Sequence, residues 1–82
     1  MKYIQMIEHK LSPRDCIVLE ELLEGDKSPT ELAKACESTT ASVTLITDKL
    51  LSRRLITRDQ NPKDRRGFII SITDKGRGLI SE

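Results

Sequence analysis

Residues 50–77 constrain the fold of this chain more than any other part of the sequence. A short β-branched run is followed there by a polar loop that contains proline and glycine, both of which interrupt a strand. After the loop the strand pattern resumes, with Phe68, Ile70 and Ile72 expected on one buried face. Two strand-like runs around a polar loop predict a β-hairpin over residues 55–73, with cations at its tip.

Cap residues divide the rest of the chain into helices. Ser12 and Ser28 are each followed by proline, and a side-chain oxygen before a proline favours the start of a helix. The helical spacing after Ser12 predicts that Leu22 and Leu23 both face the core. The expected helices are a short N-terminal helix or arm in residues 1–10, two helices that follow Ser12 and Ser28, a helix from Ser38 or Thr39 to about Arg53, and a last helix over residues 74–81 capped by Thr73.

The length and composition are typical of one small domain. A chain of 82 residues has room for a single hydrophobic core. The stretch Met1–Lys10 is charged, so we expect neither a secretion signal nor a membrane span, and a cytoplasmic location. The two cysteines lack the spacing of a zinc site, and His9 has no cluster of acids or cysteines around it in the sequence. We therefore expect no metal, no cofactor and no enzymatic activity.

Charge is distributed unevenly along the chain. Residues 1–37 carry 5 Lys/Arg and 8 Asp/Glu, whereas residues 38–82 carry 9 Lys/Arg and 5 Asp/Glu. An excess of cations in one part suggests an anionic partner, and a chance split on a solvated surface is the alternative. Tyr3 and Phe68 are the only aromatic residues, which argues against proteins that read single strands or RNA by stacking.

These motifs together resemble the winged helix-turn-helix domain of the MarR family of bacterial regulators. The resemblance covers about residues 11–79 and rests mainly on two stretches. It implies an α+β fold that is mostly α, with a cluster of three to four helices and a β-hairpin wing in one domain over residues 1–82. It also implies a double-stranded-DNA-binding transcriptional regulator of bacterial or phage type, associated with the nucleoid. The two stretches are Asn61-Pro62-Lys63-Asp64-Arg65-Arg66 and Ile72-Thr73-Asp74-Lys75-Gly76-Arg77.

The same resemblance implies specific DNA contacts. The helix over residues 40–53 would lie in the major groove, and Arg66, in a wing over residues 58–68, would enter the minor groove. Arg65 would lie near the phosphates, and Asp64 would hold a wing arginine by a charge-assisted hydrogen bond. The candidate DNA-binding residues are Thr39, Thr40, Ala41, Ser42, Thr44, Leu45, Lys49, Arg53, Arg54, Lys63, Arg65 and Arg66.

The residues of the helix at 40–53 leave two interpretations open. Its outward positions up to Lys49 offer no Arg, Asn or Gln for a bidentate base contact, so we expect modest sequence reading with more shape readout by the wing. The cations at its end fit phosphate contacts, and solvated charges that favour the negative end of a helix explain them almost as well. A winged helix that docks on another protein through exposed Leu45 and Leu51 is the competing function.

Three positions and both chain ends depart from the family pattern. Glu37, Ser38 and Arg54 stand where the family usually has glycine, a branched apolar residue and glycine, so we expect the turns around the helix to differ in detail. We also expect no long flanking helices of the kind with which relatives dimerise. Dimerisation through one apolar face near the N-terminus and packing of that face onto its own domain are both open. This face consists of Ile4, Ile7 and Leu11.

Overall fold

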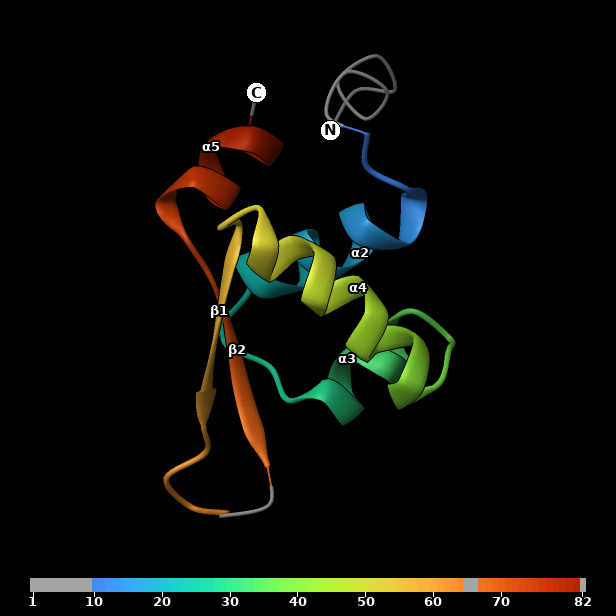
Figure 1. The fold of residues 1–82 in the computed structure, drawn as a ribbon, viewed down its shortest axis with the longest axis vertical. Helices are drawn as coiled ribbons and strands as arrows, with labels where there is room; N and C mark the ends of the chain where they lie inside the picture. The colour runs from blue at the N-terminus through green and yellow to red at the C-terminus, as the bar shows by residue number, and fades with distance from the viewer. Residues whose placement is uncertain (1–9, 65–66, 82) are drawn as a thin grey trace.

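The computed structural model describes residues 10–64 and 67–81, which form a cluster of helices with a hairpin along one side (Figure 1). The elements in chain order are α2 (Pro13–Leu23), α3 (Pro29–Ala35), α4 (Thr40–Ser52), β1 (Ile56–Gln60), β2 (Phe68–Ile72) and α5 (Asp74–Ser81). This order confirms the predicted fold class. The expected N-terminal helix or arm lies outside the described residues, apart from Lys10. Within the described ranges, no helix is long and apolar enough to cross a membrane.

The cap residues that the sequence predicts start these helices. At α2 the Ser12 hydroxyl accepts a hydrogen bond from the Asp15 amide, and the Asp15 carboxylate accepts one from the Ser12 amide. Ser28 and Glu31 form the same reciprocal pair at α3. Thr39 caps α4 and accepts a hydrogen bond from a backbone amide in its first turn. Since these bonds satisfy amides that lack a partner within the helix, the local sequence determines where each helix begins.

Helices α3 and α4 both end in a left-handed turn. Glu37 follows α3 with φ +51°, and Arg54 follows α4 with φ +61°. After α4 the Leu55 amide returns to the Leu50 carbonyl at 3.0 Å, which closes the turn. A residue with a Cβ pays about 1–2 kcal/mol for this conformation. Glu37 and Arg54, which stand where similar domains usually have glycine, therefore adopt a left-handed conformation that glycine would adopt at lower cost.

The core lies between the helices and the inner face of the hairpin. Leu23, expected inside, is exposed because other positions of α2 occupy the face toward the core. Phe68, the first residue of β2, is also 46% exposed rather than buried. The buried apolar residues are Leu11, Cys16, Val18, Leu19, Leu22, Leu32, Ala33, Cys36, Val43, Leu50, Leu55, Ile56, Ile70 and Ile80.

The two strands pair antiparallel, with Ile56 opposite Ile72. A single residue between α2 and α3, Lys27, extends this sheet on the other side of β2. The Lys27 amide donates to the Ile70 carbonyl at 3.0 Å, and the Ile70 amide donates to the Lys27 carbonyl at 2.8 Å. The sequence did not predict this pairing, because one residue carries no strand pattern. It anchors the hairpin to the segment that leads into α3.

Candidate nucleic-acid interface

Helix α4 presents small and polar side chains on the side away from the core. Its inner side is fixed by Val43, Thr47 and Leu50, which are buried. Because the inner positions hold the helix against the core, the outer positions are aligned on one surface. The candidate residues on or beside α4 that are exposed there are Thr39, Thr40, Ala41, Thr44, Leu45 and Lys49, with Ser42 partly exposed.

Several hydroxyl groups on α4 already donate hydrogen bonds within the helix. The Thr44 hydroxyl donates to the Thr40 carbonyl at 2.9 Å, and the Thr39 hydroxyl donates to Oγ of Ser42 at 3.2 Å. Ser52 donates to the carbonyl three residues before it at 2.7 Å. These bonds engage the hydroxyl protons of Thr39 and Thr44, so these two residues present oxygen lone pairs and methyl groups on the outward face.

Lys49 joins α4 to α2 through an ion pair that the sequence did not predict. Its Nζ lies 2.5 Å from Oδ2 of Asp15. Asp15 is 2% exposed, and the same oxygen accepts the Ser12 amide of the α2 cap at 2.9 Å. A buried carboxylate that loses its cation is strongly destabilising, so this ammonium stabilises the packing of α4 on α2. The Lys49 side chain is still 42% exposed, and its outer atoms remain on the α4 surface.

Arg58 on β1 connects the hairpin to α4. One guanidinium nitrogen, Nη1, lies 3.1 Å from Oδ1 of Asp48, and the guanidinium carbon lies 5.4 Å from the centroid of the Phe68 ring on β2. One side chain therefore contacts α4 and both strands. Each exposed contact contributes at most about 1 kcal/mol, so its main consequence is orientation. Arg58 is not among the residues predicted from the sequence, because only the strand register and the packing of the hairpin beside α4 reveal its role.

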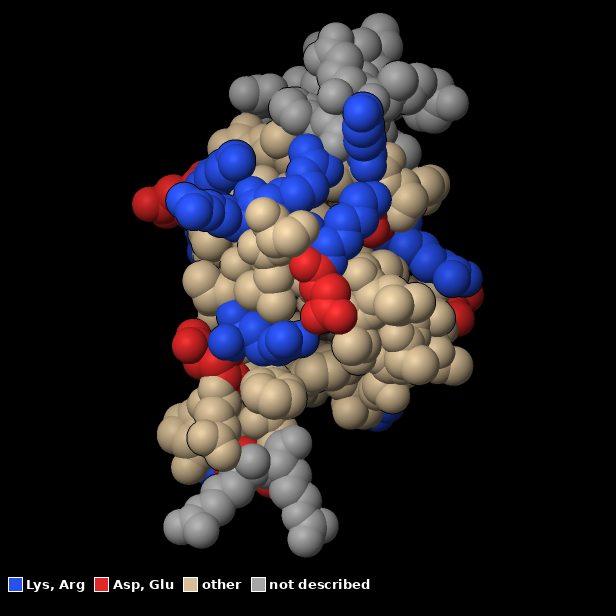
Figure 2. Space-filling view, in the orientation of Figure 1, with Lys and Arg blue, Asp and Glu red and all other residues tan. Residues whose placement is uncertain are grey.

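Cations gather where α4 ends and the hairpin begins. Arg54 is exposed and Arg53 is partly exposed. Lys75, at the start of α5, donates to the Arg53 carbonyl at 3.2 Å, and the Thr73 hydroxyl donates to the Arg54 carbonyl at 2.8 Å. Figure 2 shows Lys and Arg side chains spread over this face, with acidic side chains between them.

The loop between β1 and β2 is held by its own backbone. The Asn61 amide donates to the Gly67 carbonyl at 3.0 Å, and the Gly67 amide donates to the Asp64 carbonyl at 3.0 Å. Lys63 is exposed in this loop, as expected of a phosphate contact. The predicted support of a wing arginine by Asp64 stays a prediction, since the arginines themselves, Arg65 and Arg66, lie outside the described residues.

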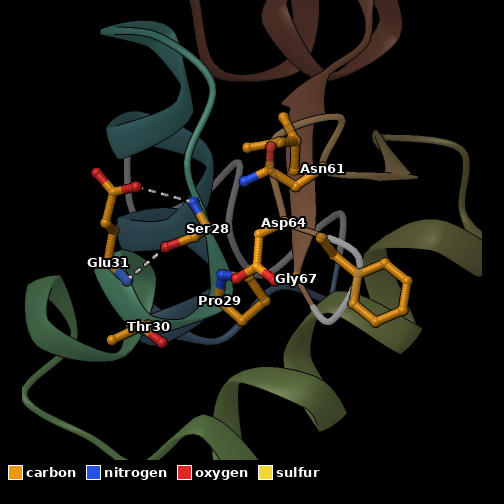
Figure 3. Close-up of a pocket in the computed structure, with 9 residues that line it drawn as sticks. Ser28, Pro29, Thr30, Glu31, Asn61, Asp64 and Gly67 are labelled. Carbon is orange, nitrogen blue, oxygen red and sulfur yellow. Dashed lines mark hydrogen bonds between the residues drawn. The ribbon is translucent and has the colours of Figure 1, made fainter.

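A cavity of about 450 Å³ lies between the start of α3 and the base of this loop (Figure 3). Ser28 and Glu31 line it from α3, and Asn61 and Asp64 line it from the loop. Among the described residues that line it, two are acidic and none is Lys or Arg. A hydrogen bond from the Ser28 backbone lowers the pKa of Glu31, which therefore stays ionised near neutral pH. Such a lining repels a phosphate, so no phosphate contact is assigned to the cavity itself.

Both cysteines are buried in the core, and neither forms a disulfide. Burial is the main cause that raises the pKa of both Cys16 and Cys36. A raised pKa keeps a thiol protonated and makes it a poor nucleophile at neutral pH. In the part of the chain that the structure describes, no group of three or more His, Cys, Asp or Glu could hold a metal ion.

Burial bears on two predicted partner surfaces. Leu11 is 6% exposed and packs in the core, which agrees with the alternative that this face packs onto its own domain. Ile4 and Ile7 lie outside the described residues, so dimerisation through them stays a prediction. Leu51 is only partly exposed and packs against the same core. Leu45, which is 73% exposed, is left without the second leucine that the docking hypothesis required.

The fold and this surface define a winged helix-turn-helix domain. Helices α3 and α4 are the two helices, and the left-handed residue Glu37 lies in the short turn between them. The hairpin β1–β2 is the wing beside the second helix. A family model described as "Transcriptional regulator SarA/Rot" matches residues 1–82, and the chain belongs to this family.

Related sequences are regulators of the same type. The HTH-type transcriptional regulator MhqR of Bacillus subtilis (strain 168) is 34% identical over 76 residues, which are 92% of this chain and 52% of MhqR. The HTH-type transcriptional repressor MdtR of the same organism is 36% identical over 72 residues, which are 87% of this chain and 46% of MdtR. The chain thus spans about half the length of the curated relatives it matches.

Solved structures share the fold. The YusO protein from Bacillus subtilis superposes with a TM-score of 0.89 at 33% identity, over 94% of this chain and 55% of YusO. A mutant MarR from E. coli complexed with operator DNA superposes with a TM-score of 0.84 at 23% identity, over 93% of this chain and 55% of that chain. These matches confirm the predicted resemblance to a MarR-like winged helix.

Proposed function

We propose that this chain binds double-stranded DNA as a transcriptional regulator in the cytoplasm, with α4 in the major groove and wing residues 58–68 in the minor groove. The observation that carries the proposal is the Arg58 bridge, in which one guanidinium contacts Asp48 of α4 and lies over Phe68 of the wing. Because this bridge holds the two elements together, they offer DNA a single surface. The MarR structure that contains operator DNA has the same fold.

Phosphate contacts are assigned to cations at the edges of this surface. Arg53 and Arg54 flank the end of α4, and Lys63 lies at the opposite end of the hairpin, in its loop. Lysine and arginine that neutralise phosphates release counterions, so affinity falls with salt by about 0.9 log units per log unit of salt for each contact. The outward residues of α4 face the bases, Arg66 at the wing tip enters the narrow minor groove, and Arg65 lies near the phosphates.

Fluorescence anisotropy of a labelled random-sequence duplex, titrated with protein at several salt concentrations, tests this proposal. We expect binding that weakens linearly on a log–log plot against salt. Arg54→Ala should reduce the slope by about one unit, as should Arg66→Ala in the wing. Arg14→Ala removes an exposed cation from α2 instead and should leave the slope unchanged.

Absence of duplex binding even at low salt would refute the proposed DNA binding. An equal reduction of the salt slope in Arg14→Ala and Arg54→Ala would refute the assignment of Arg54 as a phosphate contact. A single-stranded oligonucleotide of the same length serves as a second comparison. We expect it to bind more weakly, because Phe68 is the one aromatic side chain in the described residues and already stacks under Arg58.

A further inference from the structure

The base-facing side of α4 is unusual in its chemistry. The helix sequence, from Thr40 to Ser52, has no Arg, Asn or Gln for a bidentate hydrogen bond with guanine or adenine, and the ammonium of its one lysine, Lys49, is paired with Asp15. Its acidic residue, Asp48, is paired with Arg58. The Thr44 hydroxyl donates its proton to the Thr40 carbonyl. This helix therefore offers few side chains that could identify a base by hydrogen bonds to its edge.

Methyl groups occupy the same side. Ala41 and Leu45 are four residues apart and share one face, and both are exposed. Leu45 is 73% exposed, which makes it the most exposed large apolar residue in the part of the chain that the structure describes. Among large apolar side chains the next most exposed, Phe68, is covered on one face by Arg58.

We propose that Leu45 is a specificity-determining residue that recognises the C5-methyl group of thymine in the major groove. The inference rests on the proposed DNA binding by α4. The thymine methyl is the apolar feature that a base pair displays in that groove, and an aliphatic side chain is its natural partner. A docked protein fits less well, because Asp48 and Lys49, three and four residues after Leu45 on the same side of the helix, are charged and exposed.

The test compares thymine with uracil, which differs only by the missing methyl. Duplexes that bind the chain are selected from a random pool, and the selected duplex is then made with thymine or with uracil at each thymine position. Wild type should bind the thymine form about fourfold more tightly for each methyl that Leu45 covers. Leu45→Ala should lower this ratio to about one, and Leu45→Met, which keeps an apolar side chain, should retain most of it.

Controls separate this inference from the proposed function. Leu23→Ala changes an exposed leucine on α2 and should keep the wild-type ratio. Equal binding of thymine and uracil duplexes by wild type, or an unchanged ratio in Leu45→Ala, would overturn the role of Leu45 while leaving duplex binding intact. A wild-type chain that binds no duplex at all would overturn both. Since Leu45 is not in the core, each variant should keep the wild-type circular dichroism spectrum.

Discussion

Alanine in place of Gly76 should destabilise the domain, whereas alanine in place of Gly78, two residues later in α5, should stabilise it. A Cβ on Gly76 would lie 2.3 Å from the carbonyl oxygen of Leu55 and 2.8 Å from Cγ1 of Ile72. Real Cβ atoms essentially never approach within 3.0 Å, and the nearer atom belongs to the backbone. The same carbonyl accepts the Thr73 amide at 3.0 Å, so its movement would also disturb the start of α5.

The magnitude follows from two opposing effects. Overpacking costs about 1–3 kcal/mol, and the upper end applies here because the clash is with backbone. The higher helix propensity of alanine offsets up to about 1 kcal/mol. We therefore expect Gly76→Ala to lower the free energy of unfolding by about 2 kcal/mol. Gly78→Ala should raise it by about 0.5–1 kcal/mol, since its Cβ would meet nothing within 4 Å.

Urea unfolding followed by circular dichroism measures both variants against wild type. A loss of about 2 kcal/mol also lowers the melting temperature of a domain of this size by roughly 8–16 °C. The pair shares one helix and one type of substitution, so differences in helix propensity cancel. A Gly76→Ala variant as stable as wild type, or two variants that shift in the same direction, would refute the close approach of α5 to the end of α4.

Three further predictions concern helix ends and the ion pair between α2 and α4. Glu37→Gly should raise the free energy of unfolding by about 1 kcal/mol because φ at this position is +51°, and Glu37→Ala, which keeps a Cβ, should show no such gain in urea unfolding. Asp15→Asn should be destabilising, and less so in a Lys49→Met background; a double-mutant cycle with coupling below about 0.5 kcal/mol would contradict the ion pair. Because a Ser28 backbone bond lowers the pKa of Glu31, the stability that its charge contributes is present above the usual 4.5 and lost as pH falls through the lowered value. The stabilities of wild type and Glu31→Gln should therefore converge in acid, and parallel curves against pH would argue against this cause.

Local features of the fold follow directly from the sequence. Ser12, Ser28 and Thr73 were predicted as caps, and each accepts a bond from an amide three residues later. Such interactions join neighbours in the chain, so the residue types and their spacing are sufficient to predict them. The hairpin followed in the same way, because its loop residues and its strand periodicity are local signals.

Contacts between distant segments could not be predicted in this way. Asp15 and Lys49 are separated by 34 positions, and nothing in either helix pattern indicates that they meet. The Arg58 bridge depends on the strand register and on how the hairpin lies beside α4. Leu51 was wrongly expected to be exposed, and the sequence left open whether Leu11 packs onto its own domain, for a related reason: a helical stripe shows which residues share a face but not what covers that face.

The most direct test of the central claim is a titration of the isotope-labelled chain with a short DNA duplex, followed by amide NMR spectra. Shifts should concentrate in the first half of α4, from Thr40 to Leu45, at Arg53 and Arg54, and in the loop at residues 61–67, while the amides of α2 change little. Shifts confined to α2 and α5, or spectra that do not change on addition of duplex, would contradict a DNA-binding surface formed by α4 and the wing.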